Sequence, residues 1–222
     1  MSVRLGISVE GQTEERFVKD LLAPHLVRFG VHATPVVVAT SRTASGQKAK
    51  GGGINIDRVA SELRRLLRGY PDGTVTSLYD FYGFGDKRAD ETVERLEARI
   101  ASALGTPRNL IAYVQIYEFE GLLLSDPAIA AGYFEAPEME PLIRSVVSRA
   151  GSPEGVNEGQ TTAPSKRLEA WTRQYGSKRI YTKSTKTLHG PTLAARLTLP
   201  VIRGRCPRFA AWLSQLEFLA RP

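Results

Sequence analysis

Short apolar runs alternate with amphipathic segments along the first half of the chain. Four runs rich in β-branched and aromatic residues predict strands, over residues 3–9, 33–39, 74–82 and 110–116. Between them, apolar residues at helical spacing predict helices, beginning at Thr13 and spanning 56–69 and 89–104. This alternation is typical of the α/β class, with a mainly parallel central sheet of about four strands flanked by helices.

The pattern changes near residue 127. Helical spacing there predicts helices over 127–134, 138–150, 164–175 and 206–220. We therefore divide the chain into an α/β core, 1–126, and a mostly helical extension, 127–222, packed on that core. A basic, Gly- and Ser-rich segment at 40–55 lacks the P-loop pattern, so we expect a mobile loop, with phosphate contact as the alternative.

Acidic residues follow the predicted strands. Glu10 ends the first strand, Asp80 the third, and Glu118 and Glu120 the fourth, where the two share a face if the strand persists. The carboxyl ends of parallel strands lie at one edge of a sheet, where ligands bind. Converging carboxylates repel each other, and a divalent cation relieves that cost. We predict an Mg²⁺ or Mn²⁺ site with six candidate ligands: Glu10, Glu14, Asp80, Glu118, Glu120 and Asp126.

Each acid also has a structural interpretation. Glu14 lies in the first turn of a helix, where a negative charge complements the helix dipole. Asp126 before Pro127 has the position of a helix N-cap. Glu10 could be a solvated loop residue, and Asp80 could accept backbone N–H groups in a turn. The metal-site prediction depends on several acids converging.

Charge is unevenly distributed along the chain. Residues 165–222 contain twelve Lys or Arg and two acids, a net charge of +10, whereas residues 1–164 carry −3. A basic segment beside an acidic one indicates a polyanion-binding surface beside metal ligands, although basic tails also occur on proteins that bind no polyanion. The chain has one cysteine, no apolar run long enough for a membrane span and no signal-peptide pattern, so we expect a cytoplasmic protein.

The basic segment interleaves cations with aromatic residues. Cations bind phosphates, and aromatic faces stack on unpaired bases, so this composition predicts binding of DNA or RNA. The alternative is that Trp171 packs the helix on the core and leaves the cations solvated. Lys183 or Lys186 could reach the acids and stabilise charge during phosphodiester cleavage, and we assign that role to Lys183. The predicted nucleic-acid contacts are Lys166, Arg167, Lys178, Arg179, Lys183 and Lys186.

Several segments resemble one known family. VEGQTEERF at 9–17, LYDFYGF at 78–84, YEFEGLLLSD at 117–126 and PSKRL at 164–168 look like the signature segments of domain-of-unknown-function family 4276. The resemblance spans nearly the whole chain in order. That family is similar to the Toprim domains of topoisomerases, primases and OLD-family nucleases, which implies a Toprim-like fold.

The Toprim pattern implies roles for particular residues. A glutamate after the first strand and an Asp-x-Asp after a later strand hold Mg²⁺ in that pattern. Glu10 and Asp80 match the glutamate and the first aspartate, whereas residue 82 is Tyr in place of the second. The metal site is one ligand short unless Glu118, Glu120 or Asp126 substitutes. Some relatives of this kind are encoded beside ATPases in phage-defence loci, which implies an ATPase partner.

Two functions of different class follow. The first is a Mg²⁺-dependent nuclease that uses Glu10, Asp80, Glu118, Glu120 and Lys183 in catalysis. The second is a non-catalytic, Toprim-like subunit that binds nucleic acid for an ATPase; Tyr82 favours this alternative. A small-molecule nucleotide enzyme is a third, weakened by the lack of a Gly-rich phosphate-binding loop.

Overall fold

The computed structural model describes residues 2–38, 53–157, 159 and 161–221. Its centre is a five-stranded parallel sheet in the order β2-β1-β3-β4, with β5 continuing beside β3. The predicted α/β class and the mainly parallel, helix-flanked sheet are confirmed. The finer prediction of a Toprim fold stays a prediction. The segment at 40–55 lies mostly outside the described residues.

The first half alternates strands and helices as the pattern predicts. Strands β1 (Val3–Val9), β2 (Val31–Val37) and β3 (Thr74–Asp80) are joined through helices. Between β1 and β2 lie α1 (Gln12–Phe17), a π-helical turn (Val18–Leu22) and α2 (Ala23–Val27), and between β2 and β3 lies α3 (Ile56–Gly69). Helix α4 (Val93–Ala103) follows β3. The π-turn precedes Pro24, which lacks a backbone N–H, so the helix predicted from Thr13 changes its hydrogen-bonding pattern there.

The fourth predicted strand is interrupted. The structure has β4 (Leu110–Ile111) and β5 (Val114–Gln115) in the same register against β3, and the strand ends before Glu118. At the break, the Ser77 hydroxyl accepts the Tyr113 N–H at 2.9 Å and donates to the Tyr113 carbonyl at 2.9 Å. The Ser77 hydroxyl thus takes the place of a backbone partner on β3 and interrupts the strand-to-strand hydrogen bonding. The prediction of one continuous strand over 110–116 is therefore wrong.

The remainder of the described chain is helical. The segment after β5 forms a 3-10 helix (Phe119–Leu124), followed by α5 (Pro127–Phe134), α6 (Met139–Ala150), α7 (Pro164–Tyr175), α8 (Lys186–Leu197), α9 (Leu199–Arg205) and α10 (Pro207–Phe218). The sequence pattern did not predict α8, because Gly190 and Pro191 stand inside it. Tertiary packing outweighs that penalty: a Cβ at Gly190 would lie 2.9 Å from Thr13, so α8 packs closely on α1.

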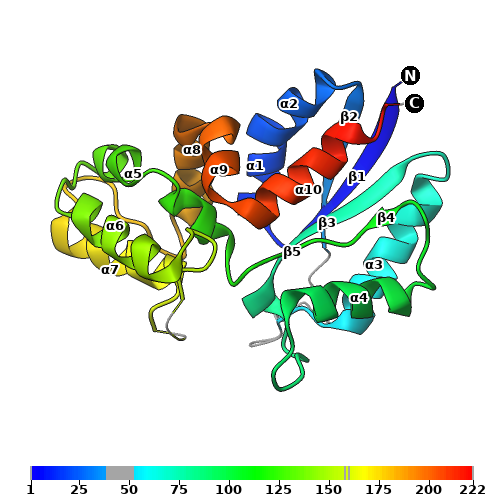
Figure 1. The fold of residues 1–222 in the computed structure, drawn as a ribbon, viewed down its shortest axis with the longest axis horizontal. Coiled ribbons are helices and arrows are strands. Elements are labelled where there is room, and N and C mark those ends of the chain that lie inside the picture. The colour runs from blue at the N-terminus through cyan, green and yellow to red at the C-terminus, as the bar shows by residue number, and fades with distance from the viewer. Residues whose placement is uncertain (1, 39–52, 158, 160, 222) are drawn as a thin grey trace, which may run out of the picture.

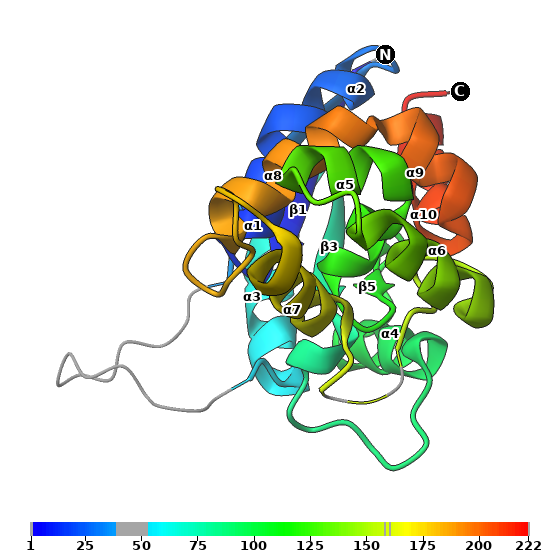
Figure 2. The same ribbon diagram turned by 90° about the vertical axis from the view of Figure 1, so that its left-hand side faces the viewer.

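Helices cover both faces of the sheet. Helices α3 and α4 lie on one face, while α1, α2, α8, α9 and α10 lie on the other (Figure 1). Helices α5, α6 and α7 extend beyond the carboxyl ends of the strands, and Figure 2 looks from that side. The carboxyl edge is therefore enclosed by C-terminal helices. No helix among the described residues is long and apolar enough to cross a membrane.

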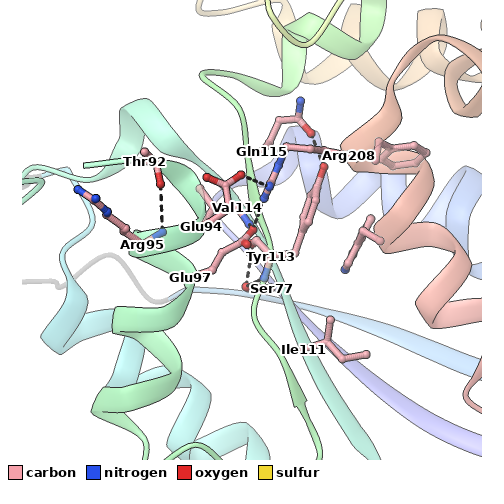
Figure 3. A network of polar contacts seen from close by, with 12 residues as sticks. Ser77, Thr92, Glu94, Arg95, Glu97, Ile111, Tyr113, Val114, Gln115 and Arg208 are labelled. Carbon is pink, nitrogen blue, oxygen red and sulfur yellow. Dashed lines mark hydrogen bonds and ion pairs between the residues drawn. The ribbon is translucent and has the colours of Figure 1, made fainter. Parts of the chain in front are cut away.

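A polar network fixes α10 to the opposite layer (Figure 3). Arg208 forms ion pairs with Glu94 and Glu97 of α4, and Glu97 also accepts the Val114 N–H at 2.8 Å. Glu154 accepts the Arg208 and Phe209 N–H groups at the start of α10, at 2.9 and 3.0 Å. The division of the chain at residue 126 stays a prediction, but these contacts join the two predicted parts around β5, at the side of the sheet.

Candidate functional site at the carboxyl edge of the sheet

Glu10 and Asp80 meet where β1 and β3 end. The two strands are neighbours, and Glu10 Oε2 accepts the Asp80 backbone N–H at 3.4 Å. Asp80 Oδ1 accepts the Phe119 N–H at 2.7 Å, which joins the segment after the fourth predicted strand to the same place. Parallel pairing therefore brings these acids to one edge, as the strand-end pattern predicts.

Glu14 approaches the same edge from the start of α1. Its Oε2 accepts the Gly11 N–H at 3.0 Å, and the side chain is buried. Glu14 therefore does lie in the first turn of a helix, as its structural interpretation states, and the charges of Glu10 and Glu120 also act on its carboxyl group. Burial, reinforced by those two acids, raises the pKa of Glu14 to about 7 against the opposing effects of its backbone hydrogen bond and Lys186.

Glu120 is buried between a phenol and an amine. Tyr181 Oη donates to Glu120 Oε1 at 2.8 Å, and Lys186 Nζ lies 3.8 Å from the same oxygen. Burial and the Glu120 charge raise the pKa of Tyr181 well above its usual range, so the phenol stays protonated. Burial lowers the pKa of Lys186, but the surrounding carboxylates, Glu120 foremost, outweigh it and raise the net value.

The acids perturb each other strongly. Burial, followed by Glu10, Glu14 and Glu120, raises the pKa of Asp80 well above its usual range. Burial is also the largest cause of the raised pKa of Glu10, where Asp80 N–H and Lys186 oppose it and Glu120 adds to it. Such mutual shifts show an excess of negative charge, and perturbed acids in one place are typical of functional sites. We call Glu10, Glu14, Asp80, Glu118 and Glu120 the carboxylate cluster.

Glu118 sits at the rim of the cluster. Its carboxylate accepts the Ser165 N–H at 2.9 Å and the Ser165 hydroxyl at 3.0 Å, at the first turn of α7. Burial and Glu120 raise its pKa, and the Ser165 hydrogen bonds lower it. Because the strand ends at Gln115, Glu118 and Glu120 do not share a strand face; Glu118 is the N-cap of the 3-10 helix, and Glu120 lies in its first turn.

Asp126 has a different position. Its Oδ1 accepts the Ile129 N–H at 3.0 Å and caps α5, as its alternative interpretation predicts. The carboxylate is therefore satisfied by a helix terminus rather than aimed at the strand ends. Its assignment as a metal ligand stays an untested prediction, and the structure gives it no support.

The predicted basic residues separate into two groups. Lys166, Lys183 and Lys186 line a cavity of about 240 Å³ together with Glu118, Ser165, Tyr181, Thr182 and Glu169, which lies 3.9 Å from Lys166 Nζ. Arg167 Nε instead donates to the Thr162 carbonyl, and Arg179 lies over the Tyr133 ring and pairs with Glu135. Lys178 is exposed. The lysine-lined cavity shares Glu118 with the carboxylate cluster, and its Lys186 pairs with Glu120 of the cluster, so the two are adjacent.

The cluster does not form a closed metal centre in this conformation. Among the described residues, no three His, Cys, Asp or Glu side chains are grouped as ready-made metal ligands. The chemistry of the donor set nevertheless fits a hard cation, because the oxygens are carboxylate and burial, reinforced by the neighbouring acids, raises the pKa of Glu10 and Asp80. Binding would require Glu10, Asp80 and Glu120 to draw closer together.

Sequence reasoning missed three residues that position the acids. Gly83 lies against the Glu10 carboxylate, Ser165 holds Glu118, and Tyr181 donates to Glu120. The glycine in LYDFYGF was a usable signal, because a glycine soon after a strand can mark close backbone approach. The Ser165 and Tyr181 contacts join residues far apart in sequence and carried no local signal.

Gly83→Ala is expected to displace Glu10 with little loss of stability. A Cβ at this position would lie 2.4 Å from Glu10 Oε2, and the displaced group is the end of a flexible side chain. We expect the free energy of unfolding to change by less than about 1 kcal/mol while any function of Glu10 is lost. Chemical denaturation beside an activity assay measures both. Unchanged activity would contradict a role for the Glu10 carboxylate position.

Comparison with known proteins places the chain in a family. The family model described as "Domain of unknown function (DUF4276)" matches residues 9–217, so it covers the sheet, the carboxylate cluster and the C-terminal helices. No curated protein and no solved structure matches the chain. Because the match extends over nearly the whole sequence, this protein belongs to the DUF4276 family.

Proposed function

We propose that this protein is a divalent-cation-dependent phosphodiesterase that acts on nucleic acid. The observation that carries the proposal is the contact between the carboxylate cluster and the lysine-lined cavity: Glu118 belongs to both, and Lys186 of the cavity pairs with Glu120 of the cluster. Carboxylates provide oxygen ligands for Mg²⁺ or Mn²⁺, and lysines bind phosphate. Their adjacency suits a phosphodiester whose reacting phosphate lies at the cluster and whose neighbouring phosphate lies in the cavity.

Individual residues would have separate tasks. Glu10, Asp80 and Glu120, with Glu14 beside them, would hold the cation, which when bound activates water and stabilises charge on the phosphoryl oxygens. Lys186 faces both the acids and the cavity, so its ammonium group is placed to stabilise negative charge that develops during cleavage. Lys183, to which the sequence assigned this task, lines the cavity, and we propose that it binds a flanking phosphate together with Lys166.

A second function remains a proposal on its own observation. Tyr82 stands where a further acid would complete the Asp-x-Asp pair, and the described acids are not grouped as metal ligands. These features favour a nucleic-acid-binding subunit without catalysis, working with an ATPase partner. That alternative also requires nucleic acid to bind at the lysine-lined cavity, but it requires no cation at the carboxylate cluster. A measurement of divalent-cation binding therefore distinguishes the two functions.

Glu10→Gln provides the test. We expect wild-type protein to bind Mn²⁺ in a calorimetric titration and to cleave a labelled oligonucleotide when Mn²⁺ or Mg²⁺ is present. Glu10→Gln keeps the shape of the side chain but removes its charge, so it should weaken Mn²⁺ binding and abolish cleavage.

The matched control is Glu15→Gln. Glu15 lies close by in sequence, in the first turn of α1, but pairs with Lys19 at 2.6 Å, outside the cluster, so this variant should behave as wild type. Wild-type protein that is folded and binds nucleic acid, but binds no Mn²⁺ at millimolar concentration, would overturn the phosphodiesterase and leave the binding subunit.

A further inference from the structure

Two partly exposed tyrosines flank the carboxylate cluster. The rings of Tyr82 and Tyr117 are 5.3 Å apart at an interplanar angle of 45°, and neither side chain is buried. Tyr82 immediately precedes Gly83, which contacts the Glu10 carboxylate, and Tyr117 immediately precedes Glu118. The aromatic pair is therefore joined by single peptide bonds to two positions at the cluster.

The backbone holds these rings in place. Tyr82 N–H donates to the Tyr117 carbonyl at 3.1 Å, which ties the turn after β3 to the segment after β5. Tyr117 has φ of +61°, a left-handed conformation that a bulky residue rarely adopts. Strain of this kind persists where the surrounding structure imposes it, and it concentrates at functional positions. The Tyr117 side chain is partly exposed and contacts the Tyr82 ring rather than lying in the core.

We infer that Tyr82 and Tyr117 form a stacking platform for an unpaired nucleobase, so that the substrate is single-stranded nucleic acid. The aromatic pair and the lysine-lined cavity both adjoin Glu118, the pair through Tyr117 and the cavity directly. A single strand presents base faces and phosphates together, whereas a duplex keeps its base faces stacked inside. This inference rests on the proposed function for the class of polymer but does not require cleavage.

Binding without metal tests the platform. We would measure fluorescence anisotropy in EDTA with a labelled single-stranded oligonucleotide, with the same sequence as a duplex, and with an abasic strand of equal charge. We expect wild type to bind the intact single strand about tenfold more tightly than the abasic strand, because one stacked base contributes on this scale. A 2-aminopurine in the intact strand should be quenched on binding.

Tyr82→Leu and Tyr82→Phe form the matched pair of variants. Tyr82→Leu should weaken binding of the intact strand about tenfold and leave the abasic strand nearly unchanged, whereas Tyr82→Phe keeps the ring and should bind as wild type. Wild-type protein that does not distinguish intact from abasic strands would overturn the platform without any variant needing to fold.

The outcomes also separate this inference from the proposed function. Cleavage that depends on Glu10, combined with equal binding of intact and abasic strands, would remove the platform and leave the phosphodiesterase. Base-dependent binding without Mn²⁺ binding would support the platform and favour the non-catalytic subunit. Absence of all nucleic-acid binding at low salt would remove both.

Discussion

Asp80→Asn is expected to stabilise the protein in metal-free buffer and to abolish cation-dependent cleavage. In the folded state burial and three neighbouring acids raise the pKa of Asp80, whereas an Asp in the unfolded state has a pKa of about 3.9. At a pH below the pKa of the unfolded state, Asp80 is protonated in both states and does not change the free energy of unfolding. As pH rises from there through the folded pKa, the ionised form favours the unfolded state, and stability falls.

Asparagine removes this penalty and keeps the contact. Its side-chain oxygen can still accept the Phe119 N–H that Asp80 Oδ1 accepts at 2.7 Å. Because the raised pKa of Asp80 makes its ionisation unfavourable in the folded state, we expect the free energy of unfolding of the variant to exceed that of wild type at pH 8, by an amount that shrinks toward pH 4. Denaturant titrations in EDTA across this range measure it. Parallel pH curves for wild type and variant would contradict the proposed charge repulsion.

Cleavage by Asp80→Asn should fall by about a hundredfold or more, because a hard cation loses a charged ligand at its centre. The combination is diagnostic. A variant that is more stable and inactive identifies a residue kept for function, whereas a variant that is unstable and inactive identifies a structural residue. A stable variant with full cleavage would exclude Asp80 from the cation site.

Lys186→Met is expected to have the opposite effect on stability. Lys186 is the cation whose charge acts on Glu10, Glu14, Asp80 and Glu118, and it pairs with Glu120. Removing one partner of a buried charge cluster leaves the others uncompensated. Because the Lys186 side chain is 37% exposed, we expect a loss at the low end of that effect, about 2–3 kcal/mol at pH 8.

The pH dependence distinguishes this loss from a packing defect. The pKa of Lys186 is raised, so the lysine is charged throughout pH 5–8 and its own titration contributes nothing there. The acids do titrate in this range; Glu14, for example, has its pKa raised to about 7. Protonation at pH 5 should therefore relieve most of the destabilisation by Lys186→Met.

Lys183→Met is the matched control for this experiment. It changes another lysine of the same cavity, but one that is exposed, so its unfolding free energy should stay within about 0.5 kcal/mol of wild type. A loss for Lys186→Met of equal size at pH 5 and pH 8 would show that the residue acts through packing of its aliphatic stem rather than through charge.

The local sequence pattern was sufficient to predict the bounds of an element where the element's own residues determine them. The strand β1 and the helix α3 follow the predicted bounds, because apolar periodicity and caps such as Asn55, which accepts the Arg58 N–H at 2.9 Å, act within a few residues. It was insufficient where a distant group decides. Ser77 interrupts the fourth strand, and Gly190 with Pro191 fits in α8 because Thr13 lies opposite.

The site divides in the same way. The pattern along the chain predicts acids at the ends of parallel strands, and the pairing of β1 with β3 is enough to bring Glu10 and Asp80 to one edge. The pattern does not predict that Lys186 rather than Lys183 faces those acids or that Ser165 holds Glu118, whereas the capping of α5 by Asp126 is a local contact that the sequence offers as an alternative. Backbone hydrogen bonding fixes strand ends locally, whereas the neighbours of a charged side chain depend on how helices distant in sequence pack over the sheet.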